Sequence, residues 1–211
     1  MKRALPIWPL IVAACAASRA PAATLVRDLG QGLTYYRVHE LPLDMPAPTS
    51  GKPGPCILDI RYAKSDEGSA GALRAWVMFN ASARAPVFVL ENAQTDPALL
   101  AALPAKGPPG FVVLAPASAQ MAPLISVNVS PEADRRAYDA LEKGSDVQSL
   151  LSDYPDKPRI DEAYLEKEHI ADSDAPDVIS DKPPPPRPLV DAMLQRAVQL
   201  HRGLLALKKI Q

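Results

Sequence analysis

The amino-acid sequence predicts an α/β fold with a small, mostly parallel sheet and crossover helices. Three continuous apolar runs carry this prediction: CILDI (56–60), PVFVL (86–90) and FVVL (111–114). They lack the polar–apolar alternation of half-exposed strands, and such runs are typical of parallel strands that are covered on both faces. Helix-length stretches such as GALRAWVMF (71–79) separate them, and crossovers of this kind give a parallel sheet. LISVNV (124–129) is a further strand candidate.

An N-terminal hairpin precedes the first apolar run. Leu25–Leu29 and Leu33–Val38 have strand character, and Gly30 and Gly32 between them can supply the turn. A stretch rich in proline and small residues, 41–55, then reads as a loop that leads into the sheet.

Helix start signals mark two later segments. In DPALLAAL, Asp96 is a good N-cap and Pro97 suits the first helical position. SPEADRRAYDALEKG repeats this pattern with Ser130 and Pro131, and Gly144 stands just past the expected end of the helix. Both segments are therefore predicted to be helices that begin at these caps.

The composition changes after residue 152. We expect an α/β core over 24–152, an acidic and Pro-rich linker over 153–188, and an amphipathic helix over 189–211. The linker ends in KPPPPRP, which favours an extended polyproline II spacer. The final helix has a wide apolar face that needs cover, either by folding back on the core or by pairing with a partner.

The N-terminal segment, 1–22, has the pattern of a signal peptide. Basic Lys2 and Arg3 precede a short apolar stretch, and an Ala-x-Ala pattern ends at Ala22. The apolar stretch is shorter than the ~20 residues that a membrane-spanning helix needs. We therefore expect export to the periplasm or cell envelope. The stretch VAAC, ending at Cys15, resembles the lipobox of bacterial lipoproteins, so attachment to the membrane through a lipidated Cys15 stays open.

Charge and residue spacing argue against several classes of ligand. The formal net charge of −1 gives no general attraction to nucleic acid or anionic lipid. Neither metal-ligand spacing among the three histidines nor a Gly-rich phosphate loop is present, so no metal and no cofactor are expected. The run DEAYLEKEH (161–169) leaves a weak cation site open beside its simpler interpretation as a solvated helix. Cys56 opens an apolar run and is expected to be a buried free thiol.

The order of these segments resembles the catalytic core of the C-terminal processing peptidases, or tail-specific proteases. The resemblance is carried by LTYYRVHEL, CILDIRYA, PVFVLENAQTDPALLAAL, GFVVLAPAS and LISVNVSPEADRRAYDAL, in this order over about 33–143. It implies a ClpP/crotonase-like ββα core with a serine nucleophile on the turn after PVFVL and a lysine as general base. A serine hydroxyl is a poor nucleophile until such a base removes its proton.

The chain departs from that family at the positions of the catalytic residues. Pro97 stands at the nucleophile position, and no lysine follows the strand GFVVLAPAS. YAKSDEG replaces the Gly-rich turn whose backbone N–H would help to hold an oxyanion. There is no room for the family's PDZ module between Val38 and Cys56. The residues of this degenerate site region are Lys64, Ser65, Asn92, Gln94, Thr95, Asp96, Pro97 and Ser118.

The sequence thus favours a pseudoenzyme, an exported peptidase-like domain that acts as a binding or scaffold protein in the bacterial envelope. Its partner would be a peptide or protein, held at the sheet end or by the C-terminal helix. The alternative is a serine hydrolase with a relocated nucleophile, Ser118 or Ser65, and with Lys64 or His39 nearby. A structural lipoprotein tethered by Cys15 is a third interpretation.

Overall fold

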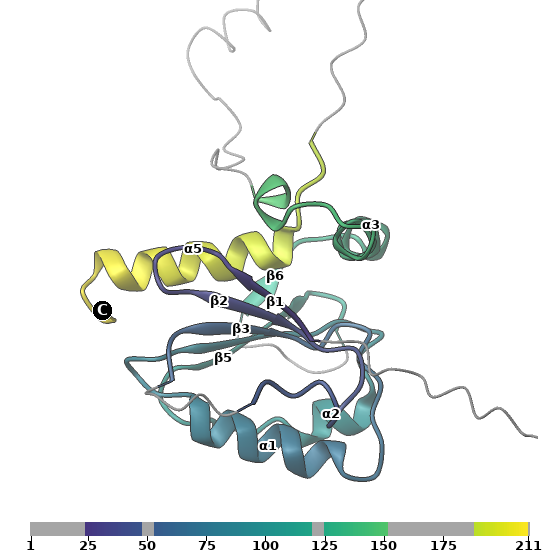
Figure 1. The fold of residues 1–211 in the computed structure, drawn as a ribbon, viewed down its shortest axis with the longest axis vertical. Coiled ribbons are helices and arrows are strands. Elements are labelled where there is room, and N and C mark those ends of the chain that lie inside the picture. The colour runs from purple at the N-terminus through teal and green to yellow at the C-terminus, as the bar shows by residue number, and fades with distance from the viewer. Residues whose placement is uncertain (1–23, 48–52, 120–124, 152–187, 211) are drawn as a thin grey trace, which may run out of the picture.

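The computed structural model describes residues 24–47, 53–119, 125–151 and 188–210. These residues form a six-stranded sheet in the order β1-β2-β3-β4-β5-β6, with helices on both sides of it (Figure 1). β1 and β2 pair antiparallel, and each later pair of neighbours is parallel. The prediction of an α/β fold with a mostly parallel sheet is therefore confirmed.

The strands lie within or overlap the predicted segments. They are β1 (Leu25–Asp28), β2 (Thr34–Arg37), β3 (Cys56–Asp59), β4 (Val87–Leu90), β5 (Phe111–Pro116) and β6 (Ile125–Val127). The chain passes from β1 to β2 through Gly30, Gln31 and Gly32, all with positive φ. Glycine adopts this backbone conformation without steric cost, so the predicted role of the two glycines in the turn is confirmed.

Two helices cover one face of the sheet, α1 (Ser69–Asn80) and α2 (Pro97–Ala102) (Figure 1). α2 begins as the sequence predicts. Oδ1 of Asp96 accepts a hydrogen bond from the backbone N–H of Ala98 at 2.8 Å, and Pro97 takes the first helical position. Because this cap depends only on adjacent residues, it could be predicted without tertiary information.

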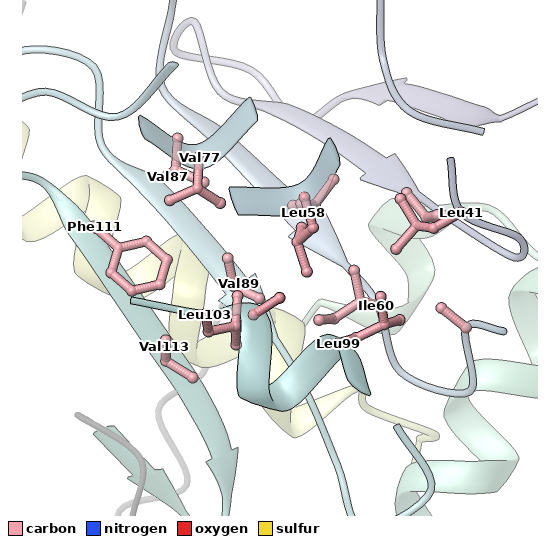
Figure 2. Close-up of a cluster of buried hydrophobic side chains, with 14 of the residues drawn as sticks. Leu41, Leu58, Ile60, Val77, Val87, Val89, Leu99, Leu103, Phe111 and Val113 are labelled. Carbon is pink, nitrogen blue, oxygen red and sulfur yellow. The ribbon is translucent and has the colours of Figure 1, made fainter. Parts of the chain in front are cut away.

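The core on this face consists of aliphatic and aromatic side chains from the sheet and the two helices. Figure 2 shows Leu58, Val87 and Val89 of the central strands packed among side chains of α1 and α2. Burying one such side chain stabilises the fold by about 1.5 to 3 kcal/mol. The three central strands are buried almost throughout, as continuous apolar runs predict.

The C-terminal helix covers the opposite face. α5 (Ala192–Ala206) contacts β4, β5 and β6, and its Met193 and Leu194 are fully buried in a second core cluster with Phe88 of β4. The sequence left open whether this helix folds back or pairs with a partner. The structure shows that its apolar side packs on the sheet of its own chain.

Two further helices complete this side of the molecule, α3 (Pro131–Glu142) and the short 3₁₀ helix η1 (Val147–Leu150). Ser130 caps α3, since its Oγ accepts from the backbone N–H of Ala133 at 3.2 Å. Gly144 has a φ of +88° just past the end of the helix, as predicted.

Some predictions fall outside the described residues. These are the signal peptide over 1–22 with Cys15, the linker up to residue 187, and the acidic run at 161–169. Within the described residues, no helix is long and apolar enough to cross a membrane.

Candidate functional site

Buried polar side chains gather at the carboxyl ends of β2, β3 and β4. Arg37 and Asp59 are the last residues of β2 and β3, and Arg61 follows closely, while Glu91 and Asn92 come directly after β4. Each of the five is at most 4% exposed. In open α/β sheets, ligand sites lie outside the carboxyl ends of the strands. We therefore take this edge as the candidate functional site.

Arg61 is the centre of the edge. Its Nη2 lies 2.8 Å from Oδ2 of Asp59, and its Nη1 lies 2.6 Å from Oδ1 of Asp134 on α3. Asp191, the N-cap of α5, receives two further bonds from the same guanidinium, of 3.2 and 2.8 Å. With the bond from Nε to Asp59, all five N–H donors of Arg61 have carboxylate acceptors. Arg61 therefore retains no donor for a ligand.

A second buried chain of hydrogen bonds starts at Asp59. Oη of Tyr35 donates to Oδ2 of Asp59 at 2.6 Å, and Nε of Arg37 donates to Oη of Tyr35 at 3.0 Å. Burial by itself would raise the pKa of Asp59. The attraction of the Arg61 guanidinium is stronger than this effect and holds the pKa of Asp59 below its usual value. Burial, reinforced by the charge of Asp59, raises the pKa of Tyr35, so the phenol stays protonated and donates.

At the rim of the site, Arg37 and His39 share one carboxylate oxygen of Glu142. Nη1 of Arg37 lies 3.0 Å from Oε1 of Glu142, and Nε2 of His39 lies 2.6 Å from the same atom. The guanidinium of Arg37 also stacks on Tyr138, with 3.9 Å between Cζ and the ring centre. Oδ2 of Asp44 accepts from the backbone N–H of His39 at 3.0 Å. The His39 ring is thus held by a carboxylate and not by either candidate serine.

The turn after β4 is closed by its own hydrogen bonds. The backbone N–H of Asn92 donates to Oγ1 of Thr95 at 2.9 Å, and that of Gln94 donates to Oδ1 of Asn92 at 2.9 Å. Nδ2 of Asn92 donates to Oδ2 of Asp134 at 2.8 Å, which ties the turn to α3. Thr95 is 2% exposed, so its hydroxyl is out of reach of a substrate, whereas Gln94 is exposed.

The structure brings together two other residues of the predicted site. Oγ of Ser65 donates to Oδ2 of Asp96 at 2.6 Å, while the other carboxylate oxygen caps α2. The bond from Ser65 lowers the pKa of Asp96, so this carboxylate is a weak base. Lys64, Pro97 and Ser118 are exposed. The predicted residues thus share one edge of the sheet, and besides the bonds within the turn after β4 the structure joins Ser65 to the capping carboxylate of Asp96.

Glu91 differs from the other carboxyl groups of the edge. It is 1% exposed, and its Oε2 has no hydrogen-bond partner among the described residues. Burial raises the pKa of Glu91 to about 7. The pKa of this carboxyl group therefore lies close to neutral pH, at a position that no sequence pattern marks.

Sulfur and metal chemistry find little support in the described part of the chain. Cys56 is buried and free, as predicted, and burial raises the pKa of its thiol to about 12, which disfavours the reactive thiolate. The described residues hold no group of three or more His, Cys, Asp or Glu that could bind a metal ion. The lack of a metal or cofactor in the whole chain stays a prediction.

Sequence reasoning singled out Asn92 but missed the buried ionic network. One signal was available, because Asp59 and Arg61 flank the end of an apolar run, and a charge at a buried strand end needs a partner. The partners themselves could not be found from spacing. Asp134 and Asp191 lie 73 and 130 positions from Arg61 in the chain.

Comparisons of the chain with protein-family models, with curated proteins and with solved structures find no match. The fold and the site define an α/β domain with a six-stranded, mostly parallel sheet whose carboxyl edge is filled by the side chains of the chain itself.

Proposed function

We propose that this chain is an exported, non-catalytic protein with a peptidase-like fold that binds a peptide or protein partner in the bacterial envelope. The observation that carries the proposal is the filled carboxyl edge of the sheet. All five donors of Arg61 are taken by carboxylates, and the turn after β4 is closed internally. An acyl-transfer site needs the opposite, an accessible nucleophile beside a base and free donors for the developing oxyanion.

The narrower fold that we propose is the ClpP/crotonase-like core of the C-terminal processing peptidases. A hairpin leads into a parallel sheet, and a turn after β4 leads directly into a helix, in the order that the resemblance requires. In this interpretation Pro97 occupies the place of the family's serine. Since Asp96 and Pro97 both serve the start of α2, the turn has the role of a helix start and not of a nucleophile.

A hydrolase would need an accessible hydroxyl group beside a base. Thr95 is buried, and Ser118 is exposed in a turn after β5. The short bond between Ser65 and Asp96 is the one observation that favours the alternative, a hydrolase with a relocated nucleophile. The depressed pKa of Asp96 opposes that alternative, because a general base should have a pKa near the working pH.

A partner would meet the exposed rim of this edge. Lys64, Asp66, Glu67 and Gln94 are all exposed and lie on the two loops that follow β3 and β4. They offer both signs of charge and an amide, which suits a polar peptide. The apolar side of α5 is packed on the sheet, so we place the binding surface at the rim and no longer at the C-terminal helix. Export directed by residues 1–22 belongs to the same proposal, and membrane attachment through a lipidated Cys15 is the alternative to a free periplasmic protein.

The test measures cleavage, serine labelling and binding together. The full-length chain is incubated with fluorescein-labelled denatured casein and, separately, with a fluorophosphonate probe for activated serines. We expect binding, seen as a rise in fluorescence anisotropy, without cleavage and without labelling. Lys64→Glu should weaken this binding, while Arg196→Glu on the exposed side of α5 should not.

Ser65→Ala and Ser118→Ala serve as controls for the chemistry. Labelling of the parent chain that disappears in either variant would establish the relocated hydrolase instead. A chain that neither binds nor cleaves casein would remove the support for a peptide partner.

A further inference from the structure

Helix α1 is apolar on nearly all sides, although only one side faces the core. Its sequence, SAGALRAWVMFN, contains a single charged residue, Arg74. The buried residues Ser69, Leu73, Val77 and Asn80 define the core-facing side. In Figure 1 the other side of α1 lies at the outside of the molecule. A helix that is hydrophobic all round is normally covered all round.

The outward side of α1 has an unusual composition for a solvent-exposed surface. Gly71, Ala75 and Met78 follow each other at helical spacing, and Phe79 lies beside them. Met78 is 53% exposed and Phe79 is 68% exposed. Nε of Arg74 donates to a backbone carbonyl of α2 at 3.2 Å, so the one charged side chain leans toward α2.

Helix α3 shows what an ordinary solvent-exposed side looks like in this chain. It exposes Glu132, Arg135 and Arg136, and it is also twelve residues long. The outward side of α1 therefore lacks the charged side chains that α3 exposes.

A shallow groove adjoins this side. It runs between α1 and α2 and is lined by Ala70, Gly71, Arg74, Ala98, Ala101 and Ala102. The lining side chains are small except for Arg74. The groove lies at the N-terminal half of α1, whereas the large exposed side chains lie at its C-terminal half.

We propose that this face of α1 is the interface of a homodimer in which α1 of two copies packs antiparallel about a two-fold axis near Ala75. An antiparallel arrangement places Met78 and Phe79 of each copy over Gly71 and the small-residue groove of the other. Each copy thus supplies both the large side chains and the surface that receives them. A two-fold interface requires this kind of self-complementarity, because the same patch must fit itself.

The charges at the two ends of the helix fit the same arrangement. Exposed Asp66 and Glu67 stand just before α1, and exposed Arg84 stands just after it. Antiparallel packing brings the acidic end of one copy to the basic end of the other, at both edges of the interface. Parallel packing would place like charges together, which disfavours that orientation.

The test is the oligomeric state of the full-length chain. Sedimentation velocity from low micromolar concentration to about 100 μM should show a monomer–dimer equilibrium, since a specific interface of modest size commonly has a micromolar or tighter Kd. Met78→Glu should raise the Kd at least about tenfold. Leu207→Glu is the matched control, because Leu207 is 70% exposed near the end of α5, and its variant should leave the Kd unchanged.

Charge reversal tests the orientation. Glu67→Lys and Arg84→Glu should each weaken the dimer, and the double variant should restore it. All of these variants change exposed side chains and should fold normally. We therefore expect the circular dichroism spectrum and the Tm of each monomeric variant to match those of the monomeric parent chain. A parent chain that stays monomeric over the whole range, or a dimer that Met78→Glu leaves intact, would overturn the proposal.

Discussion

Replacing Glu91 with glutamine is expected to stabilise the protein at alkaline pH and to change little at acidic pH. Glu91 is 1% exposed, and burial raises its pKa from the usual 4.5 to about 7. Between these two pH values the folded chain keeps a proton that the unfolded chain releases. The free energy of unfolding therefore falls as the pH rises through this window, and the loss is complete above about pH 7.

The magnitude follows from the pKa difference. One pKa unit corresponds to about 1.4 kcal/mol, so the change from 4.5 to about 7 amounts to about 3 kcal/mol. Glutamine has a similar shape and no charge at any of these pH values. Oε2 of Glu91 has no hydrogen-bond partner, and part of the glutamine amide would stand in the same unpaired position. Leaving that polar group buried without a partner offsets about 1 kcal/mol of the gain. We expect a net stabilisation of about 2 kcal/mol at about pH 8.5.

The assay is urea unfolding of both chains at about pH 5 and about pH 8.5, at one protein concentration. The difference between variant and parent isolates Glu91, because other titrating groups are common to both. Glu40→Gln, which replaces an exposed carboxyl group by an amide in the same way, is the matched control. Equal stability differences at the two pH values would refute the argument that burial sets the protonation of Glu91.

Two further predictions concern the network and the cap of α2. Arg61→Leu leaves Asp59, Asp134 and Asp191 buried without their shared cation. We therefore expect the free energy of unfolding, measured by urea unfolding, to fall by about 3 to 5 kcal/mol. A fall below about 1 kcal/mol would show that the carboxylates find other partners. Asp96→Ala removes the cap of α2 and the acceptor of the bond from Ser65, and should lower stability by about 1 kcal/mol. Asp96→Asn keeps a capping oxygen and should lower the Tm less than Asp96→Ala does, and an unchanged Tm in both would contradict the assigned role.

The buried network gives the carboxyl edge of the sheet a structural role. Arg61 joins β3, α3 and the start of α5 through Asp59, Asp134 and Asp191. A guanidinium with every donor occupied fixes the three elements in one arrangement. A catalytic cation must keep donors for the substrate. This contrast supports the non-catalytic part of the proposed function.

Local sequence determined most of the strands and helices of this protein and the residues at which α2 and α3 begin. The cap formed by Asp96 and Pro97, the cap formed by Ser130, and the turn at Gly30 and Gly32 all depend on residues within four positions of one another. Continuous apolar runs determined the parallel sheet, because a strand buried on both faces needs apolar side chains on both. These features could be predicted because their physical causes are short-range.

Tertiary structure alone decided the buried ionic network of the site and the place of the last helix. Arg61 meets Asp191 across 130 positions of sequence, and no periodicity relates the two. The pKa of Glu91 depends on burial that arises only when the sheet and helices assemble. The apolar side of α5 could be recognised in the sequence, but the surface that covers it could not. The hydrophobic effect is not directional, so an apolar face must be buried but does not specify which surface buries it.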